Sequence, residues 1–222
     1  RALMNITDQE RFRQLFESWG AEALILEKPL KSVATRDAPA LDVAFQIAVV
    51  NIFAVDEPLE PILEAARRLP EVHFHILGDT ALAEQALLAS APGNVTFTGW
   101  LMQDAYWERL LNSHAVMTLT TYPHSLVAGG TDGLAAGRPL LLSRQPALTE
   151  HFVRGAVFVD NTADGIVQGV EDVQHRYDEL ARDVIAFREQ MREHWQANFS
   201  QLQALVDATL AEDWADRRPA PN

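Results

Sequence analysis

Short apolar segments alternate with amphipathic segments along most of the chain. In residues 72–77 every second side chain is apolar, as a half-buried strand requires, whereas residues 103–112 repeat apolar side chains at four-residue spacing, as a helix requires. The pattern predicts strands at 2–6, 23–26, 43–52, 72–77, 95–98, 115–119, 139–142 and 156–159. It predicts helices near 8–18, 59–69, 80–90, 103–112, 130–136 and 147–153. This alternation predicts an α/β fold with a doubly wound parallel sheet.

Two changes in pattern predict how the chain is organised. Residues 32–41 are polar and lack a clear period, so we expect a linker between a β-α-β piece (1–31) and a Rossmann-like domain (42–162). The pattern then becomes purely helical, which predicts long C-terminal helices over 163–215. Residues 216–222 are expected to form a frayed tail.

Composition excludes several classes of function. The 222 residues include 31 acidic and 18 basic side chains, a formal net charge of −13, which argues against binding nucleic acid or anionic lipid through bulk charge. The chain has no cysteine, so disulfides, thiolate metal sites and a cysteine nucleophile are excluded. No segment approaches the roughly 18 consecutive apolar residues of a membrane span.

The segment YPHSLVAGGTDGLAAGRP, from Tyr122 to Pro139, carries the most specific chemistry. It places a polar strand end, a glycine pair and a carboxylate before a small-residue helix that ends at Gly137. Backbone N–H groups at such a helix start can face a phosphate, and the carboxylate can reach a ribose hydroxyl. Ligands of doubly wound sheets bind beyond the carboxyl ends of the strands, where this segment is expected to lie. The loops expected at that edge are 53–58, 78–80, 99–102, 120–130 and 143–146.

Three further segments occur in an order typical of one enzyme family. They read HFHILGDTALAEQAL, NVTFTGWLMQDAYWERLLNSHAVMTLTTY and GLAAGRPLLLSRQPALTEHF. Together they resemble the C-terminal, nucleotide-sugar-binding half of a GT-B glycosyltransferase, most nearly the retaining family 4, over about residues 43–199. The resemblance implies that residues 1–31 are the closing β-α-β unit of an N-terminal acceptor domain, most of which is absent from this sequence.

The resemblance places the paired acidic motif of the family on His124 and Asp132. Asp132 would hold the ribose hydroxyls, although it could also be a first-turn acid favoured by the helix dipole. His124 stands where the family has the acid that contacts the donor sugar, and it is our candidate catalytic residue. A neutral imidazole can form one hydrogen bond per nitrogen, so binding is possible where acid-like contact is not. An ordinary loop histidine is the alternative.

The family also uses an Arg and a Lys to neutralise the leaving diphosphate, and this chain has Ile52 and Glu57 at those positions. Loss of each cation removes a charge-assisted contact of about 1.5–3 kcal/mol. Arg144 could replace one of them, or could be a plain surface residue. We therefore expect backbone amides to bind the phosphates, at Ala128, Gly129, Gly130 and Thr131. A β-branched residue at Gly130 is expected to block the approach of the phosphate.

The remaining candidates lie in the other loops. Gly78 and Gly99 follow strands, where glycine permits close approach of a ligand or simply forms a turn. The remaining donor-binding candidates are Trp100 and Leu101 in the expected base-binding loop, and Glu150, which could contact the rim of the site or cap a helix. His73 and His75 share a strand face, but a metal site would need a third ligand, so we favour packed histidines.

The leading hypothesis is a glycosyltransferase that moves a hexose or N-acetylhexosamine from a nucleoside-diphosphate sugar to an acceptor. The resemblance implies catalysis without a metal or other cofactor, and an acceptor site on an N-terminal domain or a partner chain. Two alternatives stay open: a nucleoside-diphosphate-sugar epimerase, and a non-catalytic binding or assembly module that has lost its phosphate cations. We expect a cytoplasmic protein, because activated sugars are made there, and leave open peripheral attachment to the membrane.

Overall fold

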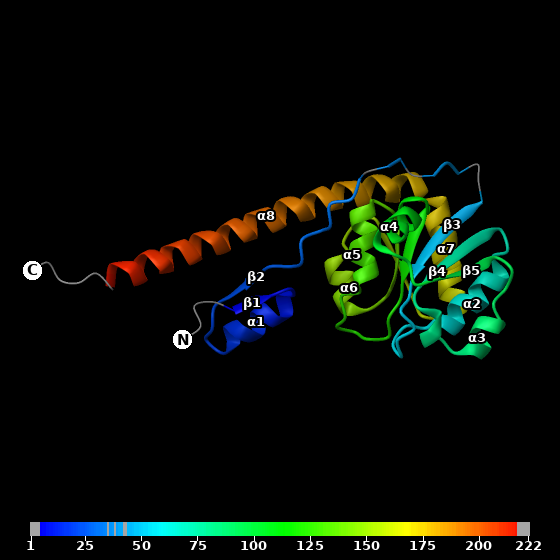
Figure 1. Cartoon of the computed structure of the whole chain (residues 1–222), viewed down its shortest axis with the longest axis horizontal. Helices are drawn as coiled ribbons and strands as arrows, with labels where there is room; N and C mark the ends of the chain where they lie inside the picture. The colour runs from blue at the N-terminus through cyan, green and yellow to red at the C-terminus, as the bar shows by residue number, and fades with distance from the viewer. Residues whose placement is uncertain (1–4, 35, 38, 42–43, 217–222) are drawn as a thin grey trace, which may run out of the picture. The chain divides into compact units, whose positions relative to one another are not determined.

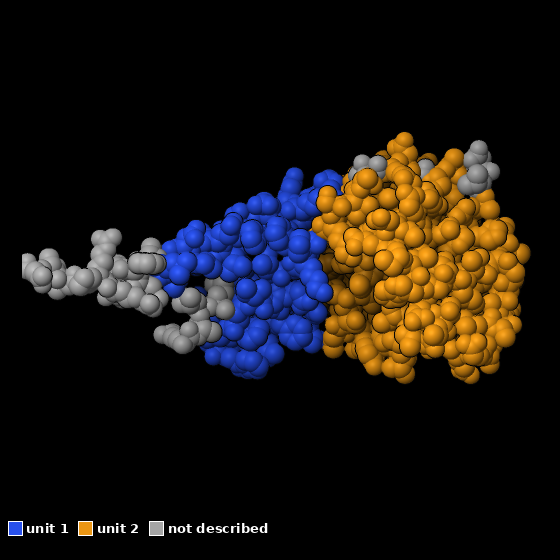
Figure 2. Space-filling model, viewed as in Figure 1, with its two compact units in different colours: residues 1–29, 189–222 blue, residues 30–188 orange. Residues whose placement is uncertain are grey.

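The computed structural model describes residues 5–34, 36–37, 39–41 and 44–216, with side chains described up to residue 210. Residues 2–4 of the strand expected at 2–6 and residues 217–222 of the tail expected at 216–222 lie outside the described part. The chain divides into two compact units, which are coloured separately in Figure 2. Unit 1 consists of residues 1–29 and 189–222, and unit 2 is the continuous segment Leu30–Arg188.

Unit 2 contains a parallel sheet of six strands, in the order β5-β4-β3-β6-β7-β8. Strands β3, β4 and β5 are labelled in Figure 1. The strands are β3 (Phe45–Val50), β4 (Val72–Leu77), β5 (Val95–Gly99), β6 (Ala115–Thr118), β7 (Leu140–Ser143) and β8 (Ala156–Val159). Every neighbouring pair is parallel. The predicted doubly wound α/β fold is therefore confirmed, and the alternation read in residues 72–77 is correct because Val72, Phe74 and Ile76 are all fully buried.

The helices follow the predicted pattern with one exception. They are α2 (Leu59–Arg68), α3 (Gln85–Ala89), α4 (Gln103–Leu111), α5 (Ala128–Ala136), α6 (Pro146–His151), α7 (Ala163–His175) and α8 (Tyr177–Asp216). The single helix expected at 80–90 is wrong: a 3₁₀ turn, η1 (Thr80–Leu82), precedes α3. The carboxylate of Asp79 accepts a hydrogen bond from the Ala81 amide, and residues 83 and 84 are extended, so the two helical turns cannot join.

Helices cover both faces of the sheet. On one face α2 and α7 pack together over the main core, which takes buried side chains from β3, β4 and β6. On the other face α4 packs against α5, and α5 lies close to the strands. This close packing depends on Gly133, because a Cβ there would lie 2.5 Å from a Leu140 methyl. The predicted long C-terminal helices are α7 and the 40-residue α8.

The strand order fixes where a ligand can bind. Strand β3 pairs with β4 on one side and with β6 on the other, so the chain winds away from β3 in both directions. The loops after β3 and β6 therefore diverge at their carboxyl ends, which creates a topological switch point. The loop 51–58 and the loop 119–127 border this point.

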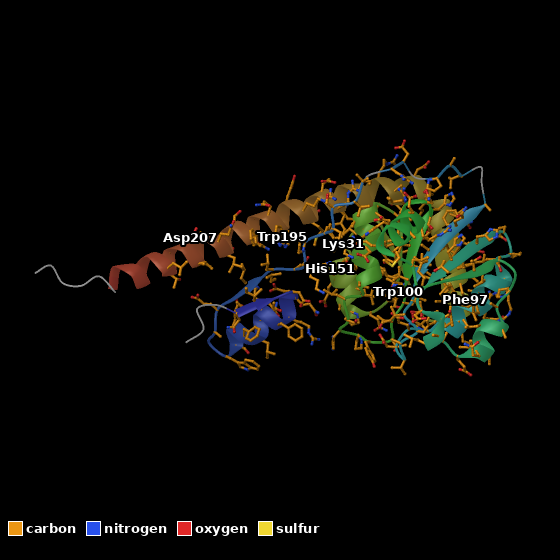
Figure 3. All side chains as sticks on the ribbon, viewed as in Figure 1. Lys31, Phe97, Trp100, His151, Trp195 and Asp207 are labelled. Atoms are coloured by element: carbon orange, nitrogen blue, oxygen red, sulfur yellow. The ribbon has the colours of Figure 1, made fainter. Side chains whose placement is uncertain are left out.

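Unit 1 contains β1 (Asn5–Thr7), α1 (Glu10–Ser18) and β2 (Ala23–Ile25), with the two strands paired in parallel. The second part of α8 belongs to the same unit, and the Trp195 indole N–H donates to the Glu27 carbonyl at 2.9 Å. Trp195, labelled in Figure 3, also stacks on Phe199 with ring centroids 4.8 Å apart. The expected β-α-β piece is present, and its origin as part of an acceptor domain stays a prediction.

Candidate functional site

The loop after β3 folds back on a carboxylate. The Ile52 amide donates to Glu57 Oε2 at 2.6 Å, and the Glu57 amide donates to the Ala54 carbonyl at 2.9 Å. Phe53 adopts the left-handed conformation with φ 61°, which non-glycine residues rarely adopt, and its amide donates to Asn51 Oδ1 at 2.8 Å. The Ile52 N–H therefore faces the Glu57 carboxylate and the Phe53 N–H faces the Asn51 side chain, so the loop offers backbone donors to an anion, as an anion-binding nest does.

The charge at this loop is negative. Burial raises the pKa of the Glu57 carboxyl, and the nearby Asp56 carboxylate adds to the increase. Hydrogen bonds from the Ile52, Ala54 and Phe53 amides act in the opposite direction without overcoming burial. The sequence prediction that Ile52 and Glu57 supply no cation here is consistent with this geometry.

The loop conformation depends on Gly78 at the end of β4. A Cβ on Gly78 would lie 1.9 Å from the Asn51 carbonyl oxygen and 3.0 Å from the Phe53 ring. The Phe53 ring packs against the main core, with its centroid 6.4 Å from that of Phe97. Gly78 therefore permits the close approach of the Asn51 backbone, where the sequence had suggested a ligand or a turn.

A polar network ties the two loops of the switch point together. The Thr120 hydroxyl donates to Asp56 Oδ2 at 2.5 Å, and the Thr121 amide donates to the Asp56 carbonyl at 2.7 Å. The Thr120 amide donates to Ser143 Oγ at 2.8 Å, whose hydroxyl donates to Asn161 at 2.6 Å. Sequence reasoning noticed a polar strand end at Thr118–Thr121 but missed this network, because its partners lie more than twenty residues away.

The start of α5 is where we predicted phosphate-binding amides. The first amides of a helix lack an acceptor within it, as the prediction requires, although the Gly130 amide donates to the Val127 carbonyl at 3.1 Å. A Cβ on Gly129 would meet Val50 at 2.7 Å, and one on Gly130 would meet the buried Phe152 ring at 2.8 Å. A substitution at Gly130 would therefore disturb core packing as well, and the expectation that Gly130 admits a phosphate stays a prediction. The Thr131 hydroxyl bonds to the Ala128 carbonyl.

Asp132 lies on the side of α5 that faces α4. The Tyr106 hydroxyl donates to Asp132 Oδ2 at 2.8 Å, and the Lys31 ammonium lies 3.4 Å from Oδ1. Lys31 is also 5.2 Å from the centre of the Trp107 ring. Burial and the Asp132 charge raise the pKa of Tyr106, so its hydroxyl remains a donor at neutral pH. The alternative that Asp132 is a first-turn acid is wrong, since the first turn of α5 contains no acid.

The other candidates lie in exposed loops or at the end of a helix. His124 is exposed in the loop that leads to α5, and Trp100, labelled in Figure 3, is 73% exposed beside Leu101. Gly99 has φ 68° at the register shift between β4 and β5, a conformation that favours glycine. Glu150 is exposed near the end of α6, whose N-cap is Gln145, so it does not cap this helix.

Arg144 is engaged with the neighbouring strand. One guanidinium nitrogen donates to the Phe158 carbonyl at 2.5 Å, and another lies 3.7 Å from Asp160 Oδ1. Both side chains of this ion pair are more than half exposed, so the pair stabilises the fold only weakly. Arg144 thus lies at the carboxyl edge of the sheet, as predicted, while directed toward β8.

Histidine and carboxylate side chains of the described residues form no cluster of three or more that could hold a metal ion. His73 and His75 stack with ring centroids 6.3 Å apart. Burial, with Arg109 and His73 nearby, lowers the pKa of His75 to about 4, so this ring is neutral at physiological pH. Within the part of the chain that the structure describes, no helix is long and apolar enough to cross a bilayer.

The sequence matches the model of the glycosyl transferase-like family over residues 57–204, more than half of the chain. The chain therefore belongs to this family. No curated protein matches the sequence significantly.

The fold matches solved GT-B glycosyltransferases. A sucrose-phosphate synthase from Thermosynechococcus elongatus is 15% identical to this chain with a TM-score of 0.72. The match covers 96% of this chain and 59% of the synthase chain. A glycosyltransferase from Rickettsia africae is 13% identical with a TM-score of 0.66, covering 96% and 64%. Anabaena HepE, solved with UDP and glucose, is 13% identical with a TM-score of 0.67, covering 90% and 63%. The chain thus spans less than two thirds of each of these proteins.

Proposed function

We propose that this chain is the donor-binding part of a glycosyltransferase that moves a sugar from a nucleoside-diphosphate sugar to an acceptor. The observation that carries the proposal is the family match over residues 57–204, which includes the loops after β4, β5, β6, β7 and β8. The switch point between β3 and β6 supports it, because ligands of open α/β sheets bind at such points. The structure of HepE with UDP and glucose adds an example of this fold with a nucleotide and a sugar.

Asp132 is the best candidate for the ribose contact. Its carboxylate is fixed by the Tyr106 hydroxyl and the Lys31 ammonium, and a carboxylate retains acceptor sites beyond these two. His124 would face the sugar, with Trp100 and Leu101 near the base. These assignments, a retaining mechanism and catalysis without a metal are parts of the proposal.

The acceptor site is proposed to lie on a further domain or a partner chain. The chain spans only part of each related structure, and one similar structure is the GtfA/B complex. A cytoplasmic location, with or without attachment to the membrane surface, follows from the proposed donor.

Calorimetric titration with UDP, GDP and ADP tests the proposal, first without metal and then with magnesium. Selective binding of one diphosphate at micromolar to millimolar concentration is the expected result. Asp132→Asn should weaken UDP more than inorganic pyrophosphate, because only UDP carries a ribose. Absence of binding of all three diphosphates would contradict the proposal and leave a non-catalytic module.

A further inference from the structure

The loop after β3 contains an anion that belongs to the protein itself. The Glu57 carboxylate accepts from the Ile52 amide at 2.6 Å, and the Phe53 and Ala54 amides also act on it. The interactions that act on this carboxyl come from backbone amides and from Asp56, with no cation among the described residues. Glu57 Oε2 therefore accepts a backbone N–H of the kind that a nest offers to a phosphate oxygen.

The position of this loop gives the contact a functional meaning. The loop forms one wall of the switch point, and Asp56 anchors it to Thr120 and Thr121 on the other wall. The loop backbone packs against Gly78, and the Phe53 ring packs against the main core. The N–H groups are therefore held in place by packing, and their direction does not depend on Glu57 alone.

We propose that the Glu57 side chain occupies an oxyanion site at the carboxyl end of β3 and competes there with the diphosphate of the donor. The proposal rests on the proposed donor-binding function. Its chemical consequence is that a diphosphate reaches the Ile52–Ala54 amides only when the Glu57 side chain swings out. Two anions cannot share the same donors, since like charges at contact distance repel.

The test compares four proteins: the unaltered chain, Glu57→Ala, Glu57→Gln and Glu60→Gln. Glu60 is an exposed acid in the first turn of α2, three residues away, so its change removes the same charge and leaves the loop intact. Each protein is titrated calorimetrically with inorganic pyrophosphate and with UDP. We expect Glu57→Ala to bind both about tenfold more tightly, the effect of one charge-assisted hydrogen bond. Glu57→Gln, which keeps a neutral oxygen in the loop, should gain less, and Glu60→Gln should match the unaltered chain.

Equal gains in Glu57→Ala and Glu60→Gln would overturn the proposal, because net charge alone would explain them. Unchanged pyrophosphate affinity in Glu57→Ala would overturn it as well. If the unaltered chain binds UDP and Glu57→Ala binds it with the same affinity, the proposed function stands and only this inference is overturned. Conversely, pyrophosphate binding gained by Glu57→Ala without UDP binding by any variant would support the oxyanion site and contradict the donor function.

A second measurement uses the unaltered chain, so its result does not depend on whether the variants fold. The amide resonances of Ile52, Phe53 and Ala54 are followed by NMR while pyrophosphate is added at saturating concentration. Displacement of the Glu57 carboxylate predicts shifts in these three amides together with the Glu57 side-chain carbonyl. Shifts confined to the start of α5 would overturn the proposal.

Discussion

The start of α5 and the loop after β3 border the same switch point, but their backbones are held in different ways. At the start of α5, glycines bring the helix backbone against Val50 and Phe152, and the space beside them is filled by core side chains. In the loop after β3, the backbone is held by packing on one side and closed by the Glu57 carboxylate on the other. A glycine-rich helix start can thus serve packing as fully as it serves ligand binding, whereas a loop with no glycine among residues 51–57 can present an anion site.

The largest expected effect comes from Gly78→Ala. The new Cβ would lie 1.9 Å from the Asn51 carbonyl oxygen, so the loop after β3 must move. We expect a loss of about 3 kcal/mol or more in the free energy of unfolding, measured by urea denaturation. Gly93→Ala is the matched control, because nothing lies within 4 Å of a Cβ there. Equal stability of the two variants would show that the loop is not braced by β4.

Gly130→Ala tests the start of α5. Its Cβ would lie 2.8 Å from the Phe152 ring, which is fully buried, and we expect a loss of about 1–3 kcal/mol. Phe152→Leu in the same chain should recover part of the loss by making room, which a double-mutant cycle measures. If Gly130→Ala lowers pyrophosphate affinity without changing stability, the glycine serves the ligand and our packing interpretation is wrong.

A smaller effect is expected from the hydrogen bond between Tyr106 and Asp132. Tyr106→Phe should lower stability by about 1 kcal/mol, since the side chain of Asp132 is only 13% exposed and loses its neutral donor. Asp132→Asn with Tyr106→Phe should cost less than the sum of the single changes, as unfolding of all three variants would reveal. Additive losses would mean that the two groups do not interact in solution.

The smallest expected effect is a pH dependence at the loop after β3. Because burial raises the pKa of Glu57, the native state holds its proton more tightly than the unfolded state does. The contribution of Glu57 to stability is therefore present at low pH and declines as the pH rises above 4.5 toward the folded-state pKa. Glu57→Gln should remove this decline, as denaturation at a series of pH values would measure, and Glu60→Gln should keep it. An unaltered slope in Glu57→Gln would assign the effect to another group.

The sequence predicted most of this fold because its periodic segments are long and buried. Strands β4 and β8 have the predicted bounds, and β3 is shorter than predicted. The break in the helix expected at 80–90 was missed because it lies at the extended residues Ala83 and Glu84, two residue types that are compatible with a helix. The sequence also predicted which loops meet at the carboxyl edge.

The interior of the candidate site was less predictable. The resemblance identified Ile52 and Glu57 as positions without a cation, but not the hydrogen bond between the amide of one and the carboxylate of the other. That bond depends on the left-handed Phe53, whose conformation nothing in its residue type favours. The contacts of the α5 glycines with Val50 and Phe152 could not be predicted, because they join segments far apart in the sequence. The assignment of these glycines to a phosphate stays a prediction.

The division into units has a consequence for how the gene can be cut. Unit 2 is encoded by one uninterrupted stretch, codons 30–188, whereas unit 1 is encoded in two pieces on either side of it. A stop codon after position 188 would cut α8 and leave residues 1–29 without the Trp195 that bonds to Glu27. Unit 2 is therefore continuous in the sequence, whereas unit 1 needs chain segments from both sides of unit 2.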